Sequence, residues 1–172
     1  MTFDLGSVRI GIVLALLTLL YGFGLGGTFG AFEDNIKGTL EASAMAVKDT
    51  VYGGDEAAMK KITGKSWTYM KRAHLHANGL GTAALAIILV LAGTRASSRV
   101  RGVISAALGL GALGYASFWM FAALTAPALG STHNAKEALG WLAIPTAGLL
   151  ILGLVATIVL FIRHYFMGRE AA

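Results

Sequence analysis

Two histidines with one residue between them, His74 and His76, lie where a charged segment meets an apolar run. An imidazole is costly to bury without a partner, and ionisable groups at membrane depth usually serve a function. Neutral imidazole is an axial ligand of haem iron and a common ligand of copper and zinc. The pair is therefore the first candidate for a cofactor or metal site.

The spacing of the two histidines predicts how they can act. Residues i and i+2 point about 200° apart on an α-helix, so a helix that runs through His76 sends the two rings to opposite faces. If the helix began only at His76 or later, an extended His-x-His unit could chelate one metal together with His133. The stretch from Trp67 to His76 contains no helix breaker, which favours the helical alternative.

His133 is the third histidine that could join this site. In a chain with four membrane spans it falls on the same membrane face as His74 and His76. Asn134 and Glu137 have the spacing of a capping box, which predicts that His133 lies one residue outside the helix of the fourth span. One of the two paired histidines could then form a ligand pair with His133 across the bundle.

Haem b is the cofactor that this arrangement favours. It needs one or two neutral imidazoles, an apolar slot, and cations near its propionates. His133 with His74 or His76 would supply the axial ligands, and Lys71 and Arg72 could contact the propionates. Glycine rows in the first and third apolar runs would leave room for the ring, although such rows more often serve close helix packing.

Copper is the alternative cofactor. Three imidazoles from His74, His76 and His133, or two of them with the carboxylate of Glu137, would suit copper or zinc. The chain has no cysteine, which excludes thiolate metal sites, iron–sulfur clusters and covalently attached haem. The sequence also lacks a nucleophile, phosphate-loop or dinucleotide motif, so at most we expect a redox subunit of an enzyme complex.

The composition places these residues in a membrane protein. Of the 172 residues, 56% are hydrophobic and 13% are charged, about half the charged share of a soluble domain. Four apolar runs, 10–30, 75–93, 102–124 and 138–162, reach or approach the ~20 residues of a membrane-spanning helix. None alternates with a period of two, as a strand would. We expect an all-α integral membrane protein, a bundle of four transmembrane helices in one membrane domain, 1–172.

Residues 31–73 form the one sizeable polar segment, between the first two spans. Helical spacing indicates a helix over 35–51, and a Gly-Gly pair breaks it. Asp55 is a candidate N-cap for a short helix Glu56–Ile62. Because the segment is too short for a core of its own, we expect two short extramembrane helices near the membrane surface.

The arginines of the short loop between the second and third spans predict the orientation. Arg95, Arg99 and Arg101 lie there without an acid, and positively charged short loops mark the cytoplasmic face. A plain count of Lys and Arg favours the opposite orientation, but 31–73 is also rich in acids. We therefore expect a bacterial inner-membrane protein with both termini cytoplasmic and the histidines at the outer face. The net charge of +5 comes from the flanks of the spans and does not indicate nucleic-acid binding.

These residues lead to two hypotheses of function. In the first, the protein is a small membrane subunit that binds haem b, or alternatively copper, and relays electrons between the quinone pool and a partner protein. The string from Arg72 to Gly81 resembles the histidine-led helix starts of membrane haem and haem–copper proteins, which agrees with this hypothesis. In the second, it is a non-catalytic accessory or anchoring subunit of a larger membrane complex. The glycine rows would then be packing surfaces and the histidines contacts with a partner.

Overall fold

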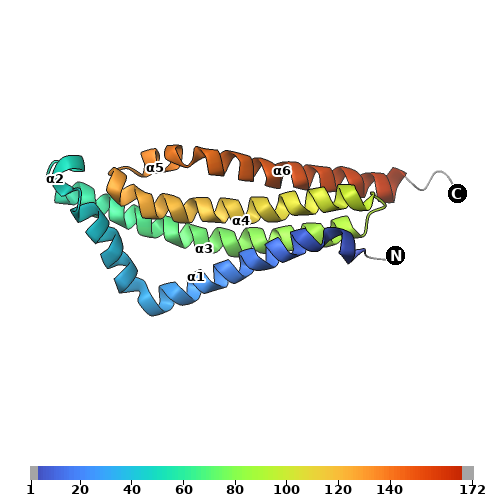
Figure 1. The fold of residues 1–172 in the computed structure, drawn as a ribbon, viewed down its shortest axis with the longest axis horizontal. Helices are drawn as coiled ribbons and strands as arrows, with labels where there is room; N and C mark the ends of the chain where they lie inside the picture. The colour runs from blue at the N-terminus through green and yellow to red at the C-terminus, as the bar shows by residue number, and fades with distance from the viewer. Residues whose placement is uncertain (1–3, 168–172) are drawn as a thin grey trace.

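Four long helices form an antiparallel bundle in the computed structural model, which describes residues 4–167 and is 91% helical (Figure 1). Each contains a stretch long and apolar enough to cross a membrane, so the predicted all-α four-helix membrane bundle is confirmed. The long helices are α1 (Leu5–Met45), α3 (Glu56–Ala92), α4 (Ser98–Leu129) and α6 (Gly140–Ile162). The short elements are α2 (Lys48–Val51), α5 (Thr132–Ala138) and a terminal π-helical turn, η1 (Arg163–Met167).

The helix α1 does not end with the first apolar run. It bends at Phe32, whose φ of −133° and ψ of 26° are not helical, and then continues to Met45. The bend directs the second half of α1 back onto α3, where Leu40 is buried against Tyr69 and Met70 (Figure 1). The polar segment is helical, as predicted, and it lengthens the bundle through α1 and α3.

The helix α3 is also longer than the sequence suggested. Asp55 is its N-cap, as predicted, and accepts a hydrogen bond of 2.9 Å from the backbone N–H of Ala58. The predicted short helix Glu56–Ile62 is wrong, because α3 continues unbroken to Ala92. A glycine inside a helix costs about 1 kcal/mol relative to alanine. Burial of Thr63 and Ser66 on either side of Gly64 offsets that cost.

The helix α5 begins earlier than the capping-box pattern indicated. Its N-cap is Ser131, whose hydroxyl accepts a 3.2 Å hydrogen bond from the backbone N–H of Asn134. Gly130 directly before it is left-handed, with φ of 62°, and ends α4. His133 therefore lies inside the first turn of α5, and the predicted N-cap at Asn134 is wrong, although His133 still precedes the fourth-span helix α6.

Small side chains let the helices approach closely throughout the membrane part. Ala15 of α1, Ala84 of α3 and Ala112 of α4 are all buried in the same core cluster, together with Leu108. Large apolar side chains point outward instead, such as Ile151, which is 62% exposed. This is the inverse of a soluble bundle and is the pattern expected of helices that contact lipid.

Candidate functional site

The charged ends of the helices indicate the depth of the histidines. Counted from Arg101 along α4, the ~30 Å of a membrane core ends near Phe121 at a rise of about 1.5 Å per residue. Counted back from Ala92 along α3, the same length ends near Arg72. His74 and His76 therefore lie just inside the apolar part, within about one turn of its boundary.

His74 lies half-buried between α3 and α1. Its Nδ1 is 2.7 Å from the backbone carbonyl oxygen of Gly22 and 3.2 Å from Nδ2 of Asn78. A carbonyl oxygen can only accept, so the shorter contact identifies Nδ1 as the protonated nitrogen and the donor. The lone pair of the neutral ring is then on Nε2. Within the described part of the chain, no hydrogen bond reaches Nε2.

Asn78, one turn after His74, completes this contact. A protonated Nδ1 cannot accept from the amide nitrogen, and the amide oxygen as placed is buried without a partner. Turning the amide by 180° puts its oxygen beside Nδ1–H, where the oxygen can accept a hydrogen bond. Asn78 has no recognisable motif in the sequence, although its spacing of four residues from His74 places both on one helix face.

Two glycines of α1 make room for this pair. A Cβ atom at Gly26 would lie 2.7 Å from Cε1 of His74, and one at Gly22 would lie 2.5 Å from Oδ1 of Asn78. Both distances are far below van der Waals contact, so no other residue fits without displacing the ring or the amide. The glycine row therefore packs against a polar pair and does more than bring two apolar surfaces together.

His76 lies on the other side of α3, against α4. Its Nδ1 donates a 2.8 Å hydrogen bond to the carbonyl oxygen of Arg72, and its ring centroid is 5.6 Å from Tyr115 and 5.7 Å from Trp119. The prediction that the two rings point to opposite faces is confirmed. The alternative of an extended His-x-His unit is wrong, because α3 is helical through both residues.

The two basic residues of the predicted site also separate. The guanidinium of Arg72 lies over the rings of Tyr69 and Trp119, at 5.2 and 5.0 Å, within the His76 cluster. Lys71 is exposed and lies three residues before His74, so it shares the face of that histidine. Nε1 of Trp119 is buried and has no hydrogen-bond partner among residues 4–167.

His133 does not join the other two histidines. Its side chain is 73% exposed, and its Nε2 is 3.2 Å from Oε1 of Glu137, which is 67% exposed. The helix α4 continues from Trp119 to Leu129 before α5 begins, a distance of about 15 Å along the axis. Two axial ligands of one metal must place their nitrogens only about 4 Å apart. Within residues 4–167, no three His, Cys, Asp or Glu side chains are close enough to hold a metal ion.

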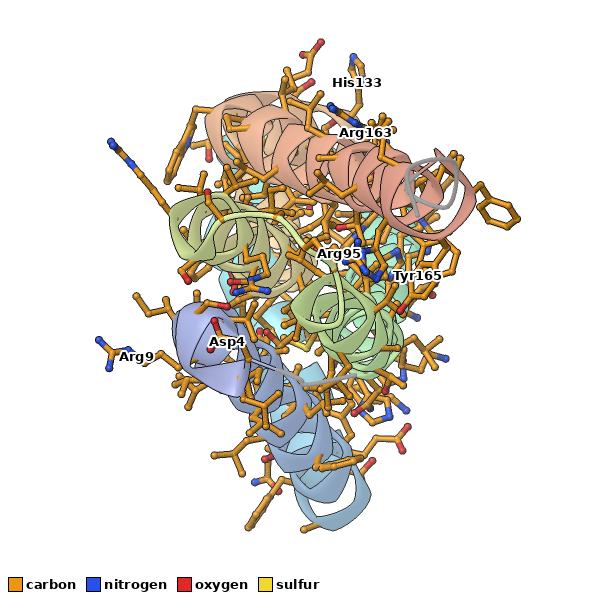
Figure 2. The ribbon with its side chains drawn as sticks, turned by 90° about the vertical axis from the view of Figure 1, so that its right-hand side faces the viewer. Asp4, Arg9, Arg95, His133, Arg163 and Tyr165 are labelled. Carbon is orange, nitrogen blue, oxygen red and sulfur yellow. The ribbon has the colours of Figure 1, made fainter. Side chains whose placement is uncertain are left out.

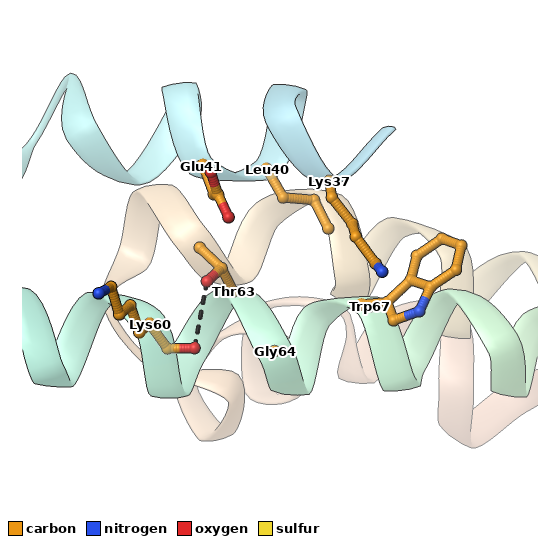
Figure 3. A pocket seen from close by; sticks show the side chains of 7 residues that line it. All are labelled: Lys37, Leu40, Glu41, Lys60, Thr63, Gly64 and Trp67. Atoms are coloured by element: carbon orange, nitrogen blue, oxygen red, sulfur yellow. Dashed lines mark hydrogen bonds between the residues drawn. The ribbon is translucent and has the colours of Figure 1, made fainter. Parts of the chain in front are cut away.

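A groove of about 240 Å³ separates α3 from the second half of α1, outside the membrane part (Figure 3). Nζ of Lys37 lies 5.4 Å from the ring of Trp67 at one end, and Lys37 also pairs with Glu33. Lys60 and Glu41 line the remainder. The groove brings both signs of charge around an indole ring, and it offers no set of metal ligands.

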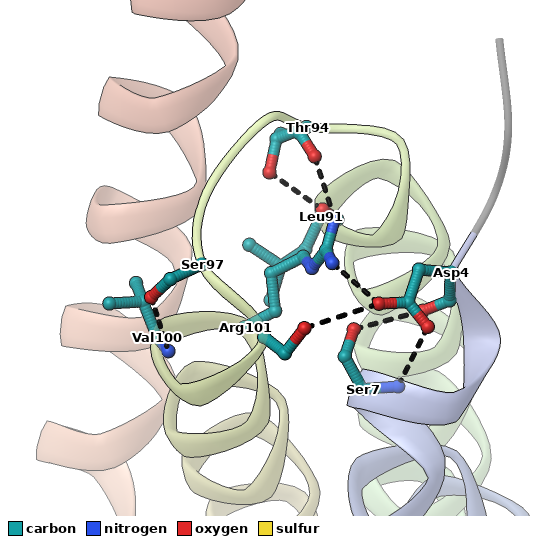
Figure 4. Close-up of polar contacts among 8 residues, drawn as sticks. Asp4, Ser7, Leu91, Thr94, Ser97, Val100 and Arg101 are labelled. Atoms are coloured by element: carbon teal, nitrogen blue, oxygen red, sulfur yellow. Dashed lines mark hydrogen bonds and ion pairs between the residues drawn. The ribbon is translucent and has the colours of Figure 1, made fainter.

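The opposite end of the bundle is closed by an ion pair that the sequence did not indicate (Figure 4). Arg101 contacts Oδ2 of Asp4 at 2.6 Å and also donates to the carbonyl oxygen of Thr94 at 2.9 Å. The backbone N–H of Ser7 donates to Asp4, and this hydrogen bond, followed by the charge of Arg101, lowers the pKa of the Asp4 carboxyl. The pair joins the start of α1 to the start of α4.

No family model, no curated protein and no solved structure matches this chain. The structure brings together His74, Asn78, Gly22 and Gly26 on one side of α3, and His76, Arg72, Tyr115 and Trp119 on the other.

Proposed function

We propose that the protein is a small membrane subunit that binds haem b through His74. The observation that carries this proposal is the 2.7 Å hydrogen bond from Nδ1–H of His74 to the carbonyl oxygen of Gly22. Ligating histidines usually donate their second ring nitrogen to a carbonyl or carboxylate, which fixes the tautomer and the ring orientation. His74 has this arrangement, with Nε2 as the ligating atom.

His74 is the one residue of this site that would hold the haem. His76 faces α4 and His133 lies in α5, so neither would share a haem with His74. Any second ligand would come from a neighbouring subunit, since haem proteins use one or two ligating residues. Lys71 shares the face of His74 and is the cation available to a propionate, whereas Arg72 is held by two aromatic rings.

The residues around His74 hold its ring in place. Gly22 and Gly26 leave the space that the ring and the Asn78 amide occupy. Phe29 packs edge-on at 6.2 Å from the His74 ring centroid and limits its rotation. Bound haem would supply one-electron transfer, and its place at the membrane boundary suits exchange between the quinone pool and a partner protein.

The charge distribution supports an orientation for this subunit. The end where α1 begins and α6 ends carries five arginines and one acid, Asp4, among the described residues. Arginine-rich short flanks favour the cytoplasmic side. We therefore place both ends of the described chain in the cytoplasm and His74 near the outer face. The arginines are Arg9, Arg95, Arg99, Arg101 and Arg163.

Haem titration tests the proposal directly. The purified protein in detergent is mixed with haemin, with and without imidazole as a surrogate for a second ligand, and the Soret band is followed. We expect saturation at one haem per chain and a shift of the band on reduction with dithionite. His74→Ala should abolish the shifted band, whereas His133→Ala should leave it unchanged. Absence of stoichiometric binding, or equal loss in the two variants, would contradict the proposal.

A second candidate function, an accessory or anchoring subunit without a cofactor, is favoured by the outer side of α1. A Cβ atom at Gly24, Gly27 or Gly30 would meet no atom within 4 Å. Each glycine lowers helix stability by about 1 kcal/mol relative to alanine, and contact within this chain does not compensate for it. A helix of a partner subunit could pack closely there. If the protein binds no haem, loss of a stable membrane complex on native gels in Gly27→Leu would support this function.

A further inference from the structure

The end of the bundle opposite the histidines has a basic pocket of about 350 Å³. It lies between the loop that joins α3 to α4, the start of α4, and the last turn of the fourth span. Arg95 enters it from the loop, and Arg163 and His164 enter it from η1. Val100 and Leu160 form apolar walls. Arg95 and Arg163 are visible at this end in Figure 2.

The positive charge of this pocket is not neutralised within the described chain. Asp4 is the one acid at this end among residues 4–167, and it is engaged by Arg101 at 2.6 Å. Neither Arg95 nor Arg163 pairs with a carboxylate of the described residues. In addition, Nδ1 of His164 is buried and has no hydrogen-bond partner among the described residues. An anion in the pocket would meet two guanidinium groups.

A largely apolar groove of about 300 Å³ lies between α3 and α6. Its one polar side chain, Thr157, donates its hydroxyl to the carbonyl oxygen of Gly153 and offers no free donor. Phe161 of the groove directly follows Leu160 of the pocket in the chain, so the groove and the pocket reach the same level of α6. The groove therefore leads toward the basic pocket. Its lining residues are Ile87, Val90, Leu154, Thr157, Ile158 and Phe161.

We propose that the pocket and the groove together form a binding site for one anionic phospholipid. The phosphate would lie between Arg95 and Arg163, with one acyl chain along the groove between α3 and α6. Basic pockets beside transmembrane helices are suited to anionic headgroups, because guanidinium groups donate to phosphate oxygens in pairs. A phospholipid fits these features better than free phosphate does, since free phosphate would use only the pocket. From Leu154 to Phe161 the groove extends about 10 Å along α6, enough for the upper part of one acyl chain.

Lipid titration in detergent tests this site. The full-length protein is titrated with phosphatidylglycerol or phosphatidylcholine, and bound lipid is counted by native mass spectrometry. We expect one phosphatidylglycerol per chain to be retained in preference to phosphatidylcholine. The double variant Arg95→Gln/Arg163→Gln should weaken that binding roughly 10- to 30-fold, given about 1 kcal/mol for each basic residue near an anionic lipid. The control Arg9→Gln/Arg99→Gln removes the same charge from the same end, outside the pocket, and should retain binding within about threefold.

Two further experiments distinguish binding of a lipid from binding of free phosphate. Ile158→Trp fills the groove and should weaken phosphatidylglycerol binding, while Ile151→Trp, which replaces an outward side chain, should not. Glycerol 3-phosphate should displace the lipid only at far higher concentration. Equal retention of the two lipids would overturn the proposal. Equal loss in the two arginine double variants, or displacement by glycerol 3-phosphate at the concentration of the lipid, would also overturn it.

Discussion

The two sides of α3 use a histidine in different ways. On the His74 side, defined by His74 and Asn78 with Gly22 and Gly26, a ring fits against glycine backbone and donates to a carbonyl on another helix. On the His76 side, the ring bonds only to its own helix and lies among aromatic side chains and Arg72. Two chemically identical residues thus differ in how tightly they are held. A tightly held ring is suited to act as a metal ligand, whereas a stacked ring can change its orientation.

The largest expected effect distinguishes the two glycine faces of α1. Gly26→Leu forces a side chain into the His74 ring, and overpacking of this kind costs about 1–3 kcal/mol. Gly27→Leu adds the same atoms to open space and should raise stability by up to about 1 kcal/mol, because leucine favours a helix more than glycine does. The midpoint of SDS-induced unfolding of the purified protein measures both. Equal midpoints would show that His74 is not packed against Gly26.

Removal of each histidine should have unequal consequences for stability. His74→Ala removes a hydrogen bond between helices, which contributes about 0.6 kcal/mol on average in membrane proteins, together with the packing of its ring. We expect a loss of about 1–2 kcal/mol in total. His76→Ala should cost less than about 1 kcal/mol, because its hydrogen bond stays within α3. The same unfolding assay applies, and a larger loss for His76→Ala would reverse the comparison.

A smaller effect is expected from the arginine of the His76 side. Arg72→Gln removes the contacts of the guanidinium with Tyr69 and Trp119, and a cation–π contact contributes about 0.5–1 kcal/mol at a partly exposed site. Lys71→Gln removes a neighbouring charge that contacts no ring and serves as the control. The change should appear in the unfolding midpoint and in the fluorescence of Trp119 with Trp67 and Trp141 replaced by phenylalanine. An unchanged spectrum would show that Arg72 does not contact Trp119.

The smallest expected effect concerns acid stability at the end of the bundle away from both histidines. The pKa of Asp4 is lowered in the folded protein, chiefly by the backbone N–H of Ser7 and then by Arg101. Its stabilising contribution is therefore complete above the unfolded-state pKa and is lost as the pH falls through the folded-state pKa. Asp4→Asn should lower the thermal midpoint slightly at neutral pH and leave no difference from the parent protein at strongly acidic pH. A difference that persists at acidic pH would contradict this assignment.

Local spacing along the chain predicted the positions of His74 and His76 correctly but not that of His133. The i and i+2 geometry was enough to predict that His74 and His76 diverge, because α3 is regular there. The same local reasoning failed at His133. The left-handed Gly130 and the Ser131 cap begin α5 before the pattern indicated, and α4 extends far enough to carry His133 away from Trp119. The bend at Phe32 had no proline to mark it and depends on packing of Leu40 against α3.

The sequence by itself determined the four apolar spans, the N-cap at Asp55 and the opposite faces of the two histidines. These depend on hydropathy and helical periodicity, which are local properties. Only the tertiary structure decided that Gly22 accepts a hydrogen bond from His74, that Arg72 lies over Trp119, and that Asp4 pairs with Arg101. Each of these contacts joins residues on different helices. Their geometry follows from how closely glycine and alanine let the helices approach, and no periodicity along the chain encodes that distance.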